Sequence, residues 1–426
     1  MTTLELFLYI LLGIFVQSGV LAIVVIYRHM RAYQFLKTRV AGFDPDIDEE
    51  LAVDANMEPV EMGKMWKGLR QFKVARKVNE NPNADICSFY LEPVDRKALP
   101  GFMPGQFLTF NLDVTDPETG GPKVITRCYS LSDAPDPDYY RVSIKRAPAP
   151  RDNPDAPPGL SSNHFHDNVH EGDILDVRAP GGHFYLEPGS TPIVLIGGGI
   201  GITPVLSMLN TALSQGSTRE IWLFYGLRNS GEHAMKKHLE ALAADHDNFH
   251  LMVCYGDPLD TDKKGVDYQH KGYVDVTLFR AVLNFRPYSF YLCGPPPMME
   301  NLVPALEDWG VPDPAINYEA FGPASLTRRA RKEDTQSQDE AVEVSVTFSK
   351  SGKTLTWDGS DDTLLDFAER NGIEVDSGCR AGGCGMCQTK IESGEVSYRQ
   401  SPDHDPDAGT CLMCVARPKQ DLTLEA

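Results

Sequence analysis

Residues 195–209 read LIGGGIGITPVLSML, and this stretch decides the fold of the middle of the chain. An apolar run leads into a glycine-rich turn, and a helical pattern follows at once. The start of that helix, near Thr203, offers free N–H groups to a pyrophosphate. The backbone can approach a ligand closely at four glycines, which are Gly197, Gly198, Gly199 and Gly201. The stretch predicts a strand–turn–helix unit for a dinucleotide, although such a turn alone can also be purely structural.

The residues around this turn alternate between strand and helix patterns. The apolar runs are PIVLIGG (192–198), EIWLFYG (220–226), FHLMVCYG (249–256) and SFYLCGP (289–295). The helical stretches between them include TPVLSMLNTAL (203–213) and EHAMKKHLEALAA (232–244). This alternation predicts a parallel α/β domain over residues 188–327.

Length and composition limit what the other residues can be. A chain of 426 residues that is 42% hydrophobic and 23% charged is long enough for several domains with their own cores. Sixty acidic and forty basic residues give a net charge of −20, which argues against a nucleic-acid binder. The nine cysteines are an odd number and cluster tightly only near the C-terminus, so they favour a reducing compartment over a disulfide framework.

The segment before the α/β domain has the pattern of an antiparallel barrel or sandwich. Over residues 67–187, short β-branched and aromatic runs are separated by Pro, Gly and Asp. A proline-rich insert, RAPAPRDNPDAPPG (146–159), predicts an exposed loop. Two charged, weakly patterned segments, 40–66 and 328–340, are interpreted as linkers.

The N-terminus carries an uncharged run, LFLYILLGIFVQSGVLAIVVIY, over residues 6–27. Its length matches a bilayer core, whereas a cleaved signal peptide would need a preceding basic region and a small-residue cleavage site; a buried core helix is the other alternative. Four basic residues follow, at Arg28, Arg31, Lys37 and Arg39. Residues 1–39 are therefore expected to form a single-pass anchor, with the N-terminus outside and the catalytic domains in the cytoplasm.

The C-terminal segment, residues 341–426, contains the cysteine cluster. It opens with two strand patterns and a helix over 363–372, which has Asp361 or Asp362 near its N-cap. The run DSGCRAGGCGMC gives Cys379, Cys384 and Cys387, and Cys411 and Cys414 come later. The C-x4-C-x2-C spacing in a glycine-rich loop is that of a plant-type [2Fe–2S] cluster. A zinc site is the alternative, but zinc favours paired short spacings.

Together with LMCVARP (412–418), this run resembles the plant-type ferredoxin signature. The resemblance implies an α+β β-grasp fold and makes Cys414 the fourth ligand, with Cys411 a spare cysteine. The metal ligands it implies are Cys379, Cys384, Cys387 and Cys414.

A second resemblance begins at ITRCYSLSD (125–133). Together with MPGQFLTF, YRVSIKR and GLSSNHFHDNVHEGDILDVRAPGGHF, this run is similar to the flavin-binding barrel of the ferredoxin–NADP reductase superfamily. The resemblance implies FAD in preference to FMN. Its implied flavin contacts are Arg127, Tyr129, Ser130, Ser143, Ile144 and Lys145, and its implied pyrophosphate contacts are Gly159, Leu160, Ser161 and Ser162.

The α/β domain carries matching features of the same superfamily. G-G-x-G-x-T-P resembles its nucleotide turn, and YLCGPPPMM (291–299) places Cys293, Gly294 and Pro295 at the nicotinamide. Tyr225 and Arg228 are expected near the adenosine half. No cluster of cations follows them, so NADH is favoured over NADPH. The resemblance also implies that YEAFGPAS (318–325) lies near the flavin. The catalytic residues it implies are Tyr129, Ser130, Cys293, Glu319 and Phe321.

The domain order flavin–nicotinamide–ferredoxin resembles that of phthalate dioxygenase reductase. It implies a membrane-tethered reductase that passes electrons from NADH through FAD and a [2Fe–2S] cluster to an oxygenase, hydroxylase or desaturase. Respiratory transfer to a quinone or a membrane cytochrome is the alternative, and a non-catalytic membrane scaffold is a third. The acid excess of the ferredoxin segment predicts a basic docking face on a protein acceptor.

Overall fold

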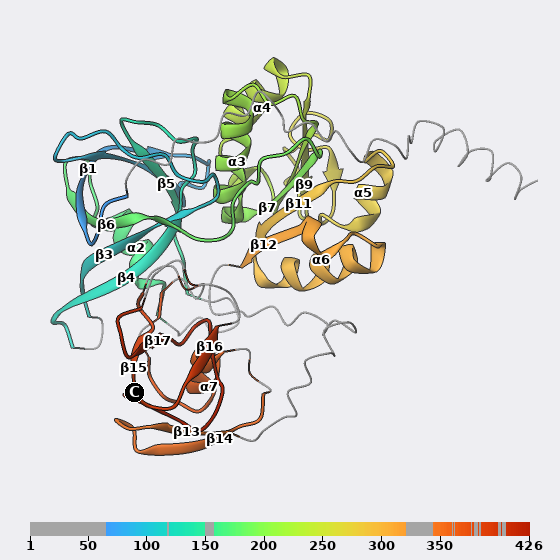
Figure 1. Ribbon diagram of the computed structural model, residues 1–426. Helices are drawn as coiled ribbons and strands as arrows, with labels where there is room; N and C mark the ends of the chain where they lie inside the picture. Colours follow the sequence, from blue (N-terminus) through green and yellow to red (C-terminus); the bar gives the residue numbers. More distant parts are fainter. Residues whose placement is uncertain are drawn as a thin grey trace, which may run out of the picture. The chain divides into compact units, whose positions relative to one another are not determined.

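The computed structural model describes residues 65–116, 119–149, 157–320, 344–359, 361, 363–375, 377–378, 382, 385–398, 402 and 406–426 (Figure 1). The expected anchor over 6–27, Phe321, Cys379 and Cys384 lie outside these residues. None of the helices within the described part is long and apolar enough to cross a bilayer.

The first domain is a six-stranded antiparallel barrel, with strand order β4-β3-β6-β1-β2-β5. Its edge strands are joined by an isolated bridge between Leu131 and Val142. The eight-residue helix α2 (Leu160–Asp167) packs Phe165 into the barrel core, against the rings of Phe89 and Phe110. The strands are β1 (Arg70–Asn79), β2 (Ile86–Pro93), β3 (Phe107–Thr115), β4 (Pro122–Ser130), β5 (Tyr140–Lys145) and β6 (Ile174–Gly181).

The second domain is a parallel sheet covered by helices, as the strand–helix alternation predicts. The strand order is β10-β9-β8-β7-β11-β12, so the chain runs outward from β7 in one direction and then returns to β11 on its other side. In such sheets, ligands bind where the order reverses, at the carboxyl ends of the strands. The strands are β7 (Ile193–Gly198), β8 (Ile221–Leu227), β9 (Phe249–Tyr255), β10 (His270–Lys271), β11 (Ser289–Gly294) and β12 (Ile316–Ala320).

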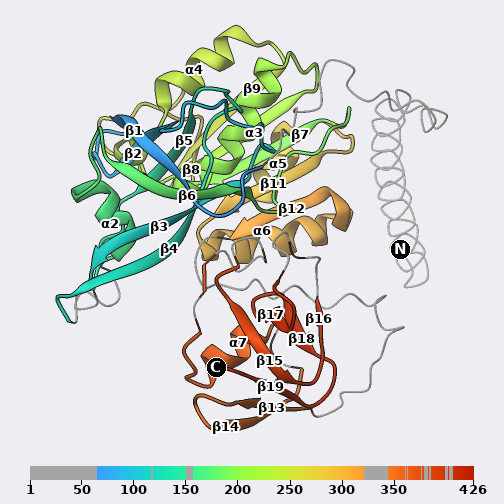
Figure 2. The same ribbon diagram turned by 60° about the vertical axis from the view of Figure 1, so that its left-hand side comes forward.

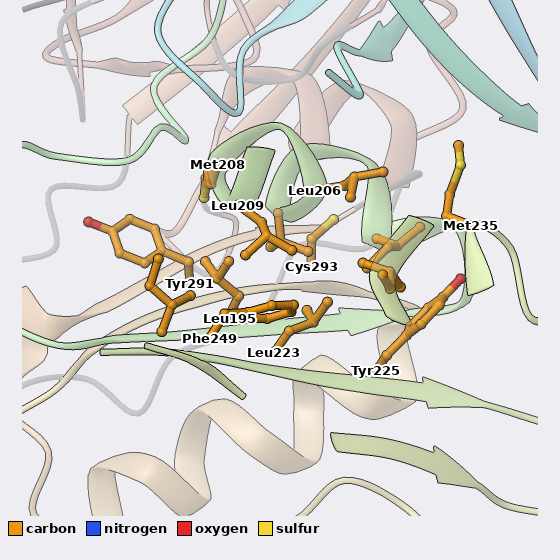
Figure 3. Close-up of a cluster of buried hydrophobic side chains, with 14 of the residues drawn as sticks. Leu195, Leu206, Met208, Leu209, Leu223, Tyr225, Met235, Phe249, Tyr291 and Cys293 are labelled. Atoms are coloured by element: carbon orange, nitrogen blue, oxygen red, sulfur yellow. The ribbon is translucent and has the colours of Figure 1, made fainter. Parts of the chain in front are cut away.

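Helices α3 (Ile202–Ser214) and α4 (Lys236–Asp245) lie on one face of this sheet, and α5 (Val276–Val282) and α6 (Pro296–Trp309) on the other (Figure 1). The strand residues alternate between the two faces. Leu223 and Cys293 join the core under α3, whereas Phe224 and Phe290 contact Phe279 of α5. Figure 3 shows the first of these cores, with Cys293 among the side chains of α3 and β7.

The third domain combines a mixed five-stranded sheet, a two-stranded sheet and one helix, which is the expected α+β arrangement (Figure 2). Helix α7 (Leu364–Arg370) is capped by Thr363, whose Oγ1 accepts a hydrogen bond from the N–H of Asp366. The N-cap therefore lies one or two residues after Asp361 and Asp362, which the sequence places near it. The strands are β13 (Val344–Phe348), β14 (Lys353–Trp357), β15 (Gln388–Ser393), β16 (Val396–Tyr398), β17 (Thr410–Leu412), β18 (Ala416–Pro418) and β19 (Leu422–Leu424).

The turn between β1 and β2 holds the barrel to the α/β domain. The N–H of Asn83 and the side-chain amide of Asn81 both donate to the carbonyl of Gly231, each at 3.0 Å. The N–H of Met235 donates to the carbonyl of Glu80. A Cβ at Gly231 would lie 2.5 Å from Asn83 Oδ1, so a larger residue there would displace the Asn83 side chain.

The barrel core yields a stability prediction. Phe165→Ala removes a completely buried ring and is expected to lower the free energy of unfolding of the barrel by about 3–5 kcal/mol. Phe285→Ala is the matched control, since Phe285 is 76% exposed and should change stability by less than about 0.5 kcal/mol. Urea titrations followed by near-ultraviolet circular dichroism measure both; equal shifts for the two variants would contradict the packing described here.

Candidate functional site

The first part of the site is the junction of strand β4 with helix α2. Tyr129 near the end of β4 and Ser161 in the first turn of α2 share a hydrogen bond between their hydroxyls, 2.8 Å long. Burial raises the pKa of Tyr129 to about 12, and the bond to Ser161 partly offsets this. Two motifs that are separate in the sequence, R-x-Y-S and G-L-S-S, thus meet in the structure.

This junction has the chemistry that a flavin dinucleotide needs. Arg127 presents an exposed guanidinium two residues before Tyr129 on β4, and its Nη1 donates to the carbonyl of Thr126. Helix α2 begins at Gly159 with no side-chain cap, and uncapped N–H groups suit a phosphate. A Cβ at Gly159 would lie 2.7 Å from the Cβ of Ala147 and 3.0 Å from Ser162 Oγ. The Leu160 side chain packs against the barrel core.

Three further predicted flavin contacts, on β4 and β5, are buried residues. The hydroxyl of Ser143 is buried between those of Ser88 (2.7 Å) and Ser132 (2.8 Å). Its strand neighbours Val142 and Ile144 belong to the barrel core, so Ser143 lies on the opposite face of β5. Ile144 is buried, and its carbonyl accepts a hydrogen bond from His166 Nε2. Ser130 is also buried, at the end of β4. Those three side chains therefore act mainly through packing and hydrogen bonds within the barrel.

The glycine-rich turn lies at the reversal point of the parallel sheet. A Cβ at Gly201 would lie 2.3 Å from the carbonyl oxygen of Cys293, so helix α3 can begin this close to β11 only with glycine there. Gly198 has the same role against Met298 and Pro295, at 2.5 and 2.8 Å. A Cβ at Gly199, in contrast, would meet nothing within 4 Å.

Two other predicted residues of this turn pack inside the protein. Gly197 approaches Ile202, whose Cα would lie 3.0 Å from an added Cβ. Thr203 is buried, and its hydroxyl donates to the carbonyl of Ile200. Thr203 therefore stabilises the turn, and the start of α3 has no side-chain cap.

Cys293, predicted near the nicotinamide, and Glu319, predicted near the flavin, are neighbours on adjacent parallel strands. The register pairs Cys293 of β11 with Glu319 of β12 and with Gly197 of β7. Burial raises the pKa of the Cys293 thiol well above its usual value, and the charge of Glu319 raises it further. Cys293 is therefore a neutral thiol, suited to steric positioning. Gly294 follows Cys293 as the last residue of β11, and Pro295 comes directly after it.

The predicted adenosine contacts differ from each other in exposure. Tyr225 is completely buried in the core beneath α3 and α4 (Figure 3), so its side chain supports the loop and does not face a ligand. Arg228 is exposed, and its Nη2 lies 3.5 Å from Asp257 Oδ2. Glu232 accepts from the N–H of Arg228 and lies 3.5 Å from Nζ of Lys145, which belongs to the barrel. An acidic side chain here suits a ribose hydroxyl better than a 2′-phosphate.

In the third domain, two of the four predicted cluster ligands are described, and they lie together. The N–H of Cys414 donates to the sulfur of Cys387 at 3.4 Å, and both residues are buried. Cys411 is buried in the domain core on β17, where burial raises the pKa of its thiol to about 12. Two thiolate ligands with a backbone N–H directed at sulfur fit an iron–sulfur cluster. Among the described residues, no group of three or more candidate side chains could hold a metal.

Asp133, which follows the predicted flavin strand by three residues, is a functional residue that no sequence pattern indicated. Its carboxylate bonds Asn210 of α3 and pairs with Arg141. The only signal in the sequence is an acidic residue directly after a predicted flavin strand, because its partners lie far along the chain.

Comparison with known proteins agrees with this geometry. Residues 195–303 match the oxidoreductase NAD-binding domain family, and residues 346–419 match the 2Fe-2S iron-sulfur cluster binding domain family. A flavohemoprotein of Halalkalibacterium halodurans is 43% identical over 260 residues, which cover 61% of this chain and 61% of that protein. The chain therefore spans about three fifths of that relative's length.

Two solved structures extend the likeness. The FAD/NAD-binding domain of nitric oxide dioxygenase from Vibrio cholerae is 32% identical (TM-score 0.53), with 60% of this chain and all of that one covered. An intact type IV self-sufficient cytochrome P450 monooxygenase is 25% identical (TM-score 0.53) and covers 84% of this chain and 41% of its own.

The fold and site define an oxidoreductase of the ferredoxin reductase type that uses NAD(P)H, with FAD and a [2Fe–2S] cluster as cofactors. The chain belongs to the ferredoxin–NADP reductase superfamily and carries a C-terminal 2Fe-2S iron-sulfur cluster binding domain.

The close approach at the nucleotide turn gives a second prediction. Gly201→Ala should push the turn away from β11 and slow flavin reduction by NADH at least about tenfold, with FAD retained. Gly121→Ala is the control, because Gly121 has no positive φ and an added Cβ would meet only Thr119 Oγ1, at 3.6 Å. Stopped-flow absorbance measures the rate, and normal reduction of the Gly201 variant would contradict this role.

The cysteine placements give a third prediction. Cys414→Ser should abolish the visible absorption of the cluster while NADH still reduces the flavin, because Cys414 lies beside Cys387. Cys411→Ser should keep the cluster, since Cys411 is a core residue. The visible absorbance and iron content of the two purified variants measure cluster retention. Loss of the cluster in Cys411→Ser and its retention in Cys414→Ser would make Cys411 the fourth ligand.

Proposed function

We propose that the protein is an NADH-dependent reductase that supplies single electrons to a metalloprotein acceptor such as an oxygenase, hydroxylase or desaturase. One observation carries the proposal: three electron-transfer domains occur on one chain. The flavin-type barrel is hydrogen-bonded to the nicotinamide-type domain. In the ferredoxin-type domain, Cys387 and Cys414 lie in contact. When bound, FAD takes two electrons as a hydride and the cluster passes them on singly, so a two-electron donor can serve a one-electron acceptor.

The chain's own residues bind and orient these groups. Arg127, with its exposed guanidinium, and the uncapped start of α2 would bind the flavin phosphates, and Tyr129 would line the flavin side. The turn at Gly199 leaves open space in front of α3 for the nucleotide pyrophosphate. Cys293 is completely buried in the core under α3 as a neutral thiol, so it would support the nicotinamide site by packing and would exchange no proton.

The preference for NADH is supported by Glu232. Its carboxylate lies at the end of the second strand of the parallel sheet, next to the backbone of Arg228. A carboxylate would accept a hydrogen bond from a ribose hydroxyl but repel a 2′-phosphate. Arg228 is the only cation of that loop before Lys236.

The acceptor is proposed to be a protein. The similar P450 monooxygenase structure covers most of this chain, which supports a P450 or oxygenase partner. In the ferredoxin-type domain, acidic residues outnumber basic ones around α7, although Asp361 is ion-paired with Arg370. A partner with a basic face would complement this surface. We further propose that the apolar run over 6–27 tethers the protein to the cytoplasmic side of a membrane, where it meets its acceptor.

The docking proposal predicts a salt effect. Reduction of cytochrome c, used as a basic acceptor, should slow several-fold when salt rises from about 0.05 M to about 0.5 M, because screening weakens charge attraction. The NADH-to-flavin step is the internal control and should not change. A rate of cytochrome c reduction that does not change with salt would contradict docking guided by charge.

The test of the function is anaerobic stopped-flow reduction of the liposome-bound protein by NADH, with flavin and cluster absorbance followed separately. The proposal expects both to bleach in sequence and the cluster to stay reduced when a membrane quinone is added. Rapid reoxidation by the quinone would favour a respiratory role instead. Failure of NADH to bleach the flavin would contradict the reductase itself.

A further inference from the structure

A buried polar junction joins the flavin strand to the nucleotide-binding helix. We propose that Asp133 and Asn210 are positioning residues that fix the exit of strand β4 against helix α3 and thereby set the distance for hydride transfer. This inference rests on the proposed function and goes beyond it by assigning the geometry of the reaction to a pair of residues outside the cofactor contacts.

The barrel half of the junction follows the flavin strand directly. Asp133 lies three residues after Ser130, the last residue of β4. Its main-chain carbonyl accepts a hydrogen bond from Ser207 Oγ at 2.7 Å, and its Oδ1 accepts one from Asn210 Nδ2 at 2.7 Å. Asp133 therefore holds α3 through both its backbone and its side chain.

The second carboxylate oxygen of Asp133 is held from within the barrel. Arg141 Nη1 lies 3.1 Å from Asp133 Oδ2, and Tyr139 Oη donates to the same oxygen at 3.3 Å. The guanidinium of Arg141 also donates to the carbonyl and the hydroxyl of Ser132. The charge of Asp133 is thus paired, and contacts within the barrel hold its carboxylate on the side opposite to the Asn210 bond.

Asn210 is held in turn by the α/β domain. Ser207 and Asn210 are both buried on α3. Because the Nδ2 of Asn210 donates to Asp133, its Oδ1 is the atom that accepts from His238 Nε2 of α4, at 2.9 Å. The amide of Asn210 is therefore engaged at both ends and cannot rotate without losing a buried hydrogen bond.

The position of this junction connects it to the reaction. Helix α3 begins at Ile202, directly after the glycine-rich turn, and Ser207 and Asn210 lie one and two turns further along. On the other side, Ser130 and Tyr129 are the predicted flavin contacts. A shift at Asp133 would move the helix that carries the nucleotide relative to the strand that carries the flavin, and a displacement of about 1 Å can cost about a hundredfold in rate.

The test is a charge swap in the full-length, FAD-loaded protein. Asn210→Asp places a carboxylate against Asp133, and the double variant Asp133→Asn/Asn210→Asp restores a donor–acceptor pair with the roles exchanged. Asn248→Asp is the matched control, because the Asn248 amide donates to the carbonyls of Ser217 and Arg219 inside the α/β domain and does not face the barrel.

The limiting rate of flavin reduction, the NADH dissociation constant and the isotope effect with deuterated NADH are measured together. Asn210→Asp should slow reduction about 10- to 100-fold and raise the isotope effect, with NADH affinity changed by less than about twofold. The swap should recover most of the lost rate, and Asn248→Asp should keep the wild-type rate. If Asn210→Asp does not retain FAD, Asn210→Ala is judged by the same criteria.

Wild-type rates in a folded Asn210 variant, or no recovery in a folded swap, would overturn the inference and leave the reductase function intact. A wild-type flavin that NADH does not reduce would instead overturn the proposed function.

Discussion

The organisation of the protein depends on one close backbone approach, between the first turn of α3 and strand β11. At Gly201 an added Cβ would lie 2.3 Å from the carbonyl oxygen of Cys293, so no other residue fits there without movement of the backbone. This contact places the start of α3, the glycine-rich turn and the thiol of Cys293 together at the reversal point of the sheet. The proposed nicotinamide site is thus built from backbone more than from side chains.

In the barrel, hydrogen bonds hold the predicted flavin contacts in place in the same way. The hydrogen bond between the hydroxyls of Tyr129 and Ser161 joins strand β4 to helix α2. The N–H of Asn83 donates to the carbonyl of Gly231, in the loop that also carries Glu232. The proposed flavin and nucleotide contacts therefore belong to two domains that are hydrogen-bonded at several points. Such preorganisation suits a reaction whose chemistry resides in cofactors and whose protein must hold distances.

The sequence predicted the features that local patterns encode, and it could not predict those that depend on distant partners. Strand–helix alternation and glycine spacing were sufficient for the parallel sheet and its turn. The hydroxyl of Ser143 is engaged by Ser88 of the neighbouring strand, and core packing buries Tyr225; the local pattern encodes neither contact. The cap at Thr363 depended on a single hydrogen bond. Asp133 could not be recognised because Asn210 lies far along the chain.

The most direct test of the account is an anaerobic titration that counts the electrons taken up by the purified full-length protein from NADH. A flavin and a one-electron cluster that communicate within one chain should take up about three electrons per chain, with flavin and cluster absorbance both lost at the end. Uptake of about two electrons, with the cluster absorbance unchanged, would show that the ferredoxin-type domain does not receive electrons from the flavin and would contradict the account.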